Sequence, residues 1–240
     1  MSSNDEAEPA KRQRRRRGSI NAEHILAGAF ALSREDSLDN LTMLRLADHL
    51  DIGVTSLYWY YRSKDELFEA MSTEAFRIFY ERMTPPEAEH WDDALRQYFR
   101  EFRSILKDDP VICDLVVVRV EYIRPEGLIV FMRHADRLLA KLVGAGFTPA
   151  EALQAYNALS IFVRGSNFID RSREAGGHVQ GFAADLKRTL GAGEAETLPA
   201  LTAAVSASDA SVDDEFEFGL ENAIRGLRAV LADKAARPSA

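Results

Sequence analysis

Apolar residues recur along most of the chain at the three- and four-residue spacing of amphipathic helices, and no alternating strand pattern persists. The segment 91–105 shows the spacing with Trp91, Leu95, Tyr98, Phe99, Phe102 and Ile105. Six of the eight prolines lie between or at the starts of such segments, where helices begin or end. Residues 111–123 are rich in β-branched side chains, but a lone strand would lack a partner, so we expect helix there too. The pattern therefore predicts an all-α fold.

Three short helices and one longer helix are predicted between residues 20 and 80. The second short helix runs from Thr42, with Leu44, Ala47 and Leu50 facing inward, and Gly53 provides the turn that follows it. The third spans residues 54–60. A capping box, Ser63-Lys-Asp-Glu66, then opens the longer helix.

Beyond Pro86 the spacing predicts five or six longer helices. A second capping box, Thr148-Pro-Ala-Glu151, opens the helix 149–171, and the last helix covers about 213–233. Glycines at 176, 177 and 181, and the segment 191–196, indicate loops.

Two of these helices carry too much apolar surface for a single contact face. Helix 149–171 has one narrow polar stripe, and the last helix has a stripe of small residues beside its large apolar one. We therefore expect a four-helix seam between two copies of the chain, although both helices could instead be central in a monomer. The candidate interface residues are Ala155, Leu159, Phe162, Gly219, Ala223, Gly226 and Val230.

The charge is divided unevenly. The whole chain carries a net charge of -8 with a pI near 5.3, which argues against a polyanionic partner. Residues 11–64, however, hold ten Lys or Arg against six Asp or Glu, which is +4, and the remainder holds -12. Asymmetry of this kind indicates a basic arm or module on an acidic body.

The most basic stretch has six cations in the seven residues 11–17. We expect residues 1–19 to form a disordered basic arm, because such a run repels itself and buries no apolar surface. The arginines Arg14, Arg15, Arg16 and Arg17 are candidates for contact with nucleic-acid phosphates. The alternative is a tail that only increases solubility.

Several other classes of protein are disfavoured. The longest stretch without a charge is twelve residues, too short to span a membrane, and no secretory signal is present. A single cysteine, Cys113, fits a reducing compartment. We expect a cytoplasmic protein with no membrane partner.

No enzyme signature is recognisable. The Gly-rich phosphate-binding loops, the nucleophile elbow and the zinc motifs are missing, and Glu87-Ala-Glu-His90 matches only one of the two motifs that a di-iron bundle needs. We expect no catalytic residues, no metal and no cofactor.

Residues 41–61 predict two short helices joined by a turn. The second helix would bury Leu57 and Tyr61, four residues apart, so that some of the neighbouring aromatic residues must face outward. Thr and Ser at its start can approach base edges, and Tyr and Trp can reach phosphates and thymine methyl groups. Exposed aromatic side chains are costly unless they bind something.

These residues resemble a known family. The segment Leu41-Thr-Met, Leu46-Ala, Leu50, then Ser56-Leu-Tyr-Trp-Tyr-Tyr-Arg-Ser-Lys-Asp-Glu-Leu67 is similar to the DNA-binding domain of the TetR (tetracycline-repressor) family of bacterial transcription regulators, over about fifty-five residues. The resemblance implies that residues 54–60 form the recognition helix. It also assigns DNA contacts, to bases or phosphates, to Thr42, Thr55, Ser56, Tyr58, Trp59, Tyr60 and Lys64.

The chain departs from the family pattern at the turn, where Asp51 stands at a position commonly occupied by glycine. Residues 20–70 hold four Lys or Arg against nine Asp or Glu, a net charge of -5. This deficit increases the importance of the arginine arm for DNA binding.

The resemblance further implies an architecture: a helix-turn-helix DNA-binding domain at 20–66, a larger helical ligand-binding and dimerisation domain at 67–234, and a tail at 235–240. It also implies a homodimer that binds a palindromic operator in double-stranded DNA, usually as a repressor. A small-molecule effector would release it by changing the separation of the recognition helices.

Aromatic and aliphatic residues in the larger domain suffice for a mostly apolar pocket. The candidates are Phe99, Phe102, Arg103, Phe131, Tyr156, Asn157, Phe162 and Arg164. Arg164 interrupts an apolar helix and is expected to need an anion or a buried acid. The alternative function is a helical carrier or interaction protein whose basic arm binds nucleic acid non-specifically.

Overall fold

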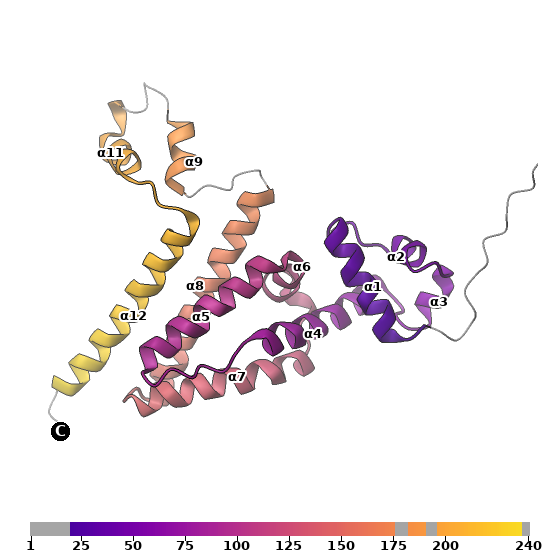
Figure 1. The fold of residues 1–240 in the computed structure, drawn as a ribbon, viewed down its shortest axis with the longest axis horizontal. Coiled ribbons are helices and arrows are strands. Elements are labelled where there is room, and N and C mark those ends of the chain that lie inside the picture. Colours follow the sequence, from indigo (N-terminus) through magenta and orange to yellow (C-terminus); the bar gives the residue numbers. More distant parts are fainter. Residues whose placement is uncertain (1–19, 176–181, 191–195, 237–240) are drawn as a thin grey trace, which may run out of the picture. The chain divides into compact units, whose positions relative to one another are not determined.

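The computed structural model describes residues 20–175, 182–190 and 196–236, which are helical with connecting loops (Figure 1). No strand occurs in these ranges, which confirms the all-α expectation. They form two compact units, the head (through Met71) and the body (from Ser72). The expected basic arm 1–19, with Arg14 to Arg17, and the glycines at 176, 177, 181 and 191 lie outside the described residues. No helix in the described ranges is long and apolar enough to cross a membrane.

The head contains three complete helices and the start of a fourth. Side chains cap two of them, because Asn21 accepts from the amide of His24 at 2.8 Å and Thr42 accepts from that of Arg45 at 3.2 Å. A core of fully buried residues, Ile25, Leu46, Leu57 and Leu67, holds the helices together. The helices are α1 (Ala22–Glu35), α2 (Met43–His49), α3 (Val54–Tyr58) and α4 (Lys64–Arg82).

Three details of the head differ from the sequence expectation. Leu44 is 62% exposed, and Leu46 occupies the inward position instead. The turn residue with left-handed backbone is Asp51, at φ 53°, whereas Gly53 is extended at φ -72° and caps α3. The regular part of the third helix is also shorter, since it ends at Tyr58.

The capping box at the start of α4 is present. The amide of Glu66 donates to the Ser63 hydroxyl at 3.1 Å, as predicted. The Glu66 carboxylate accepts from the amide of Arg62, at 2.6 Å, and so caps the residue before Ser63. Both bonds fix the connection between α3 and α4.

Besides the rest of α4, the body contains four long helices and three short ones in the described ranges. The predicted box at Thr148 and Glu151 is confirmed by reciprocal bonds of 3.2 and 2.7 Å. The last helix runs two residues into the predicted tail 235–240. The helices are α5 (Trp91–Asp108), α6 (Pro110–Cys113), α7 (Pro125–Gly144), α8 (Pro149–Ala175), α9 (Phe182–Thr189), α11 (Pro199–Ala207) and α12 (Val212–Ala236).

The segment 111–123 is helical, as expected, but irregular. After α6 it widens into a π-helical turn, Asp114–Val118, and then tightens into a 3-10 turn, Val120–Tyr122. The hydroxyl of Ser72 donates to the carbonyl of Leu115 at 3.1 Å, so α4 holds this turn in place. Wide turns of this kind leave backbone groups that need outside partners.

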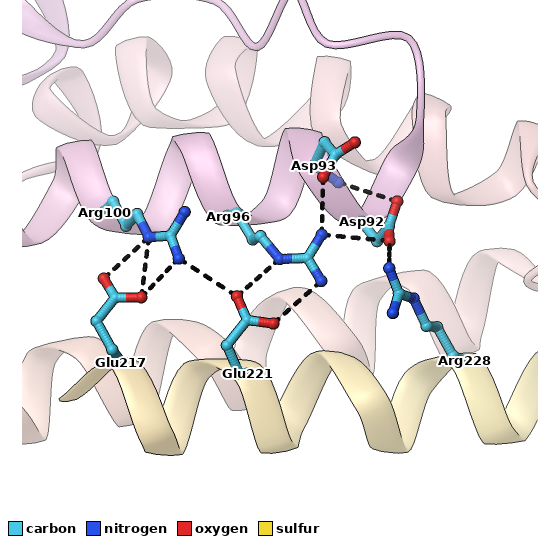
Figure 2. Close-up of polar contacts among 7 residues, drawn as sticks. All are labelled: Asp92, Asp93, Arg96, Arg100, Glu217, Glu221 and Arg228. Carbon is cyan, nitrogen blue, oxygen red and sulfur yellow. Dashed lines mark hydrogen bonds and ion pairs between the residues drawn. The ribbon is translucent and has the colours of Figure 1, made fainter. Parts of the chain in front are cut away.

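A ladder of ion pairs joins α5 to α12 (Figure 2). Arg96 binds Glu221 at 2.7 Å, and Arg100 binds Glu217 at 2.6 Å. At one end of the ladder Asp92 pairs with Arg228. Hydrogen bonding from Arg96 holds the pKa of Glu221 below its ordinary value. The ladder covers the seam between the two helices, while their apolar sides face the interior.

Candidate nucleic-acid and ligand interfaces

The third helix of the head turns polar and aromatic side chains outward. Thr55 and Ser56 are exposed at its start, and Tyr58 and Trp59 are 47% and 85% exposed at its end. A five-residue helix has only one inward side, and Leu57 fills it. The predicted split between buried and outward residues is therefore present, and it leaves a compact surface of hydroxyl and aromatic groups.

Tyr60 has a second role that the sequence did not indicate. Its side chain is 42% exposed, and its hydroxyl donates to the backbone carbonyl of Ile20 at 2.6 Å. Ile20 is the first described residue, directly after the predicted basic arm. The bond therefore ties the root of the arm to the end of the recognition segment.

The two predicted phosphate-contacting residues lie at helix starts. Thr42 is exposed and precedes α2, and Lys64 is the first residue of α4. The Lys64 ammonium stands 4.9 Å from the centre of the Phe68 ring. Free amide groups and the helix dipole favour an anion at such positions.

The positive charge of the head is partly engaged within the fold. Arg45 forms an ion pair with Asp36 at 2.6 Å and donates to the carbonyl of Asn40 at 2.9 Å. The amide of Asn40, together with Arg45, lowers the pKa of Asp36, which stays ionised at neutral pH. Arg45, one of the four Lys or Arg of residues 20–70, is therefore already neutralised within the fold.

The body brings some of the predicted pocket residues together in an aromatic interior. The ring centres of Phe99 and Phe131 lie 5.9 and 6.0 Å from that of Tyr156, and the Arg164 guanidinium lies 5.4 Å from the centre of Phe102. Arg164 donates to the carbonyl of Val116 at 2.7 Å, so a backbone carbonyl of the π-helical turn supplies the partner for which we expected an anion or a buried acid.

Two other predicted pocket residues belong to a different place, between α8 and α12. A cavity of about 350 Å³ there is lined by Phe162, Ser166, Asp170 and Phe216, among others. Buried Arg103 pairs with Asp170 at 2.7 Å, and burial raises the pKa of that carboxyl. Asn157 lies exposed on α8. The predicted set is thus divided between two locations.

Sequence reasoning missed four residues of the aromatic interior. Tyr80, Tyr98 and Ser160 are buried there, and His134 is half-buried beside Tyr80, with ring centres 5.2 Å apart. Tyr98 was recognised only as part of an apolar stripe. The residues come from four helices, so spacing along one helix could not reveal that they meet.

The predicted interface residues are also divided. Ala155 and Leu159 are buried inside the body. A Cβ on Gly219 would stand 2.4 Å from the Phe162 ring, so this glycine already admits a close contact within the chain. Ala223, Gly226 and Val230 are exposed on α12. Other large apolar side chains exposed on α8 and α12 are Leu153, Ile161, Phe168, Ile169 and Phe218.

The described residues contain no group of three or more His, Cys, Asp or Glu side chains placed to hold a metal ion. Glu87 and His90, the candidate half of a di-iron motif, are both exposed. Cys113 is buried, and burial raises its pKa to about 12, which keeps the thiol protonated and unreactive at neutral pH.

Both parts of the chain match family models. Residues 25–71 match the model described as bacterial regulatory proteins of the tetR family, and residues 84–231 match the tetracyclin repressor-like C-terminal domain. The second match alone covers more than half of the chain.

Individual relatives agree with these models. An HTH-type transcriptional repressor of Mycobacterium tuberculosis is 42% identical over 163 residues, which is 68% of this chain and 62% of that relative's length. An HTH-type transcriptional regulator of Saccharopolyspora erythraea is 28% identical over 91% of this chain and 89% of its own. The crystal structure of the Streptomyces coelicolor TetR family protein ActR in complex with actinorhodin superposes with a TM-score of 0.69 at 26% identity, covering 88% of this chain and 98% of that one.

Proposed function

The chain belongs to the TetR family of bacterial regulatory proteins, and on this premise we propose that it is a homodimeric transcriptional repressor, released from a palindromic operator by a small molecule. The M. tuberculosis relative is named a repressor, which supports the direction of regulation. The single observation that carries the DNA-binding role is the outward cluster on α3.

In this proposal Thr55 and Ser56 approach base edges from the start of α3, while Tyr58 and Trp59 contact phosphates or thymine methyl groups. Exposure of the Trp59 ring to water costs free energy, and a bound partner that covers the ring would recover this free energy. Thr42 and Lys64 hold phosphates at either side, where their helix starts already favour anions.

The test is binding of DNA taken from upstream of the protein's own gene, measured by fluorescence anisotropy for wild type and Tyr58→Ala. We expect affinity to fall about 10- to 100-fold, the value of one or two good groove contacts. Met132→Ala, which removes an equally exposed apolar side chain from α7 in the body, is the matched control and should bind as wild type. Equal binding by wild type and Tyr58→Ala would favour the alternative, a helical carrier whose arm binds nucleic acid without specificity.

We further propose that the arm 1–19 supplies the cationic charge that the head lacks. Its support is the sequence, with six cations in residues 11–17, together with the bond from Tyr60 to Ile20, which would anchor the arm beside α3. The arginines Arg14 to Arg17 would then lie along phosphates adjoining the α3 contacts.

Deletion of residues 1–17 tests the arm. Since each neutralised phosphate adds about 0.9 to the slope of log affinity against log salt, the deletion should flatten that slope by up to about 5. Tyr60→Phe, which keeps the ring and loses the bond to Ile20, should weaken binding while keeping most of the slope. An unchanged affinity across the salt series would exclude the arm from DNA binding.

Dimerisation is proposed through α8 and α12, where Ile161, Phe168 and Phe218 are exposed beside the small residues Ala223 and Gly226. A two-fold seam of this kind would let the side chains of one copy pack on the small residues of the other. Ile161→Glu should convert the dimer to monomer in sedimentation velocity, and Met132→Glu, on α7, should not.

Effector binding is assigned to the body. ActR, which shares its fold, is described in complexes with actinorhodin and with (S)-DNPA, which supports a small-molecule site in this chain's body as well. The aromatic interior and the α8–α12 cavity are the two places that the predicted pocket residues mark out. We expect an apolar or amphipathic effector, whose binding would alter the spacing of the two recognition helices.

A further inference from the structure

Three tyrosines from three different helices gather in the interior of the body. Tyr80 comes from α4, Tyr98 from α5 and Tyr156 from α8, and all three are buried. The hydroxyl oxygens of Tyr98 and Tyr156 are 3.1 Å apart and form a hydrogen bond. Phe131 from α7 lies against two of the rings, with its centre 5.9 Å from that of Tyr80 and 6.0 Å from that of Tyr156.

Polar atoms without a partner are concentrated around these rings. The buried side-chain polar atoms without a hydrogen-bond partner in the described residues include Tyr80 Oη, His134 Nδ1 and Ser160 Oγ. Burial raises the pKa of Tyr156 and the nearby hydroxyls of Ser160 and Tyr80 lower it, yet neither of these two hydroxyls has a partner at hydrogen-bond distance and angle. Buried polar atoms are nearly always paired, so this cluster requires an explanation.

One positive charge acts on the three hydroxyls. Arg164 lowers the pKa of all three tyrosines, against the larger effect of burial, which raises it. One of its N–H groups donates to Val116, and its guanidinium lies over the ring of Phe102. Burial lowers the pKa of His134, which is therefore mostly neutral at pH 7. A guest oxygen with negative charge would find a cation and several neutral donors together.

We propose that this tyrosine chamber (Tyr80, Tyr98, Phe131, His134, Tyr156, Ser160 and Arg164) binds a planar aromatic anion that carries ring-attached oxygen atoms. The flat face of Tyr156 suits an aromatic ring once Phe131 has moved aside. The unpaired hydroxyls of Tyr80 and Ser160 donate to its oxygens, and Arg164 balances its charge. The inference rests on the proposed function, since the chamber would be the effector site of that regulator.

We place the entrance of the chamber at Phe131. Its side chain is half-buried, unlike the tyrosines that it covers, and it fills the space between Tyr80 and Tyr156. The occupant takes the place of this ring, so that Phe131 acts as a plug on the α7 side of the chamber. Removing the plug should therefore strengthen binding, because the guest no longer has to displace it.

The probe is 1-hydroxy-2-naphthoate, a planar ring with a phenol beside a carboxylate, titrated into the full-length protein by its own fluorescence. The methyl ester of the same acid removes the charge, and 2-naphthylmethylammonium reverses it. We expect the acid to bind at least tenfold more tightly than the ester, and the cation not to bind. Equal binding of acid and ester, or preference for the cation, would overturn the assignment.

Substitutions locate the probe. Tyr80→Phe and Ser160→Ala each remove only an unpaired hydroxyl, so urea unfolding should show unchanged or higher stability, while probe affinity falls about tenfold. Arg164→Gln should abolish the preference for acid over ester, and Phe131→Ala should tighten binding. Ser166→Ala, the same change on the same helix at the α8–α12 cavity, is the matched control and should bind as wild type.

The outcomes separate this proposal from the one on which it rests. If the protein binds operator DNA but no probe at millimolar concentration, or if Ser166→Ala loses the probe while Tyr80→Phe keeps it, the chamber is not the site and the DNA-binding role stands. If the probe follows the predicted order of variants but the protein binds no DNA, the regulator is wrong and the chamber stands.

Discussion

Aromatic side chains have opposite surroundings in the two units. Tyr58 and Trp59 in the head project into solvent at the end of α3, whereas Tyr80 and Tyr98 in the body are buried. In the head the neighbouring polar groups are surface hydroxyls, which form hydrogen bonds with water. In the body the tyrosine hydroxyls lie together in the interior, where only another protein group or a bound ligand can form hydrogen bonds with them.

The contrast separates two signs of function. On the surface, function is indicated by exposed apolar area, as at Trp59, because a partner that covers this area would lower the free energy. In the interior, function is indicated by a buried polar atom that has no hydrogen-bond partner, as at Tyr80, because a ligand that hydrogen-bonds to it would lower the free energy. The head thus exposes apolar area that a partner could cover, and the body contains an unpaired polar atom that a ligand could bind.

Substitution of Phe79 is expected to give the largest change in the free energy of unfolding. Phe79 is an aromatic residue of the body whose side chain has no polar atom. It is fully buried, with its ring centre 4.7 Å from that of Phe102 and 4.8 Å from that of Tyr80. Phe79→Ala should lower the free energy of unfolding by about 3–5 kcal/mol, since it removes a packed ring and leaves a cavity. Urea unfolding followed by circular dichroism measures the change.

Trp59→Ala is the corresponding change in the head. It should alter the free energy of unfolding by less than about 0.5 kcal/mol, because the ring contacts little of its own chain. Operator affinity should fall at least tenfold. If Trp59→Ala destabilised the protein as much as Phe79→Ala, its exposure would not be a sign of function and the comparison would fail.

Two glycines on α12 extend the comparison from rings to helix surfaces. Gly219→Ala would place its Cβ 2.4 Å from the Phe162 ring, and we expect it to destabilise the body by about 1–3 kcal/mol. Among the described residues nothing on another element lies within 4 Å of a Cβ built on Gly226, so Gly226→Ala should stabilise the helix by about 1 kcal/mol.

Association separates the two glycines further. If Gly226 lies in the proposed dimer seam, Gly226→Ala should weaken the dimer in sedimentation equilibrium even as it stabilises the helix. If Gly226→Ala left the dissociation constant of the dimer unchanged, Gly226 would lie outside the interface.

The sequence was sufficient to predict the head because its signals are local. The capping pair Ser63 and Glu66 and the buried pair Leu57 and Tyr61 each lie within one helical turn of one another, so spacing alone fixes their relation. Leu44 was placed wrongly because a seven-residue helix is too short for its apolar side to be assigned from periodicity. Hydrophobic periodicity needs several turns to define a face.

The chamber in the body could not be predicted in the same way. Tyr80 and His134 are 54 positions apart, and their contact depends on how α4 packs against α7. Phe99, Phe131 and Tyr156 were recognised as candidates from their type alone, which did not distinguish the chamber from the cavity that contains Phe162. Likewise, the role of Gly219 depends on which ring lies opposite it.

The turn of the head gives a smaller test. Asp51 has left-handed backbone, which non-glycine residues adopt at a cost, so Asp51→Gly should stabilise the head by about 0.5–1 kcal/mol. It also removes an exposed negative charge near α3, and operator affinity should rise a few-fold at low salt. Asp51→Asn, which removes the charge and keeps a side chain tolerated in this conformation, should raise affinity with little gain in stability. If Asp51→Gly stabilised no more than Asp51→Asn, the backbone explanation would be wrong.

The ion-pair ladder between α5 and α12 gives the smallest expected effect, and it tests whether a charge that is already paired within the body contributes to DNA binding. Glu221 binds Arg96, and because its pKa in the folded protein lies below the unfolded value, its contribution to stability is present above about pH 4.5 and is lost as the pH falls through the folded pKa. Glu221→Gln should therefore lower the free energy of unfolding by up to about 1 kcal/mol at pH 7 and by progressively less as the pH falls below about 4.5. Urea midpoints across this range measure the difference, and Glu89→Gln, in the exposed loop before α5, controls for loss of a charge. Operator binding should be the same for wild type, Glu221→Gln and Glu89→Gln, because Glu221 is already paired within the body and Glu89 lies outside the head, whereas the exposed rings of Tyr58 and Trp59 lie on the proposed DNA-binding surface.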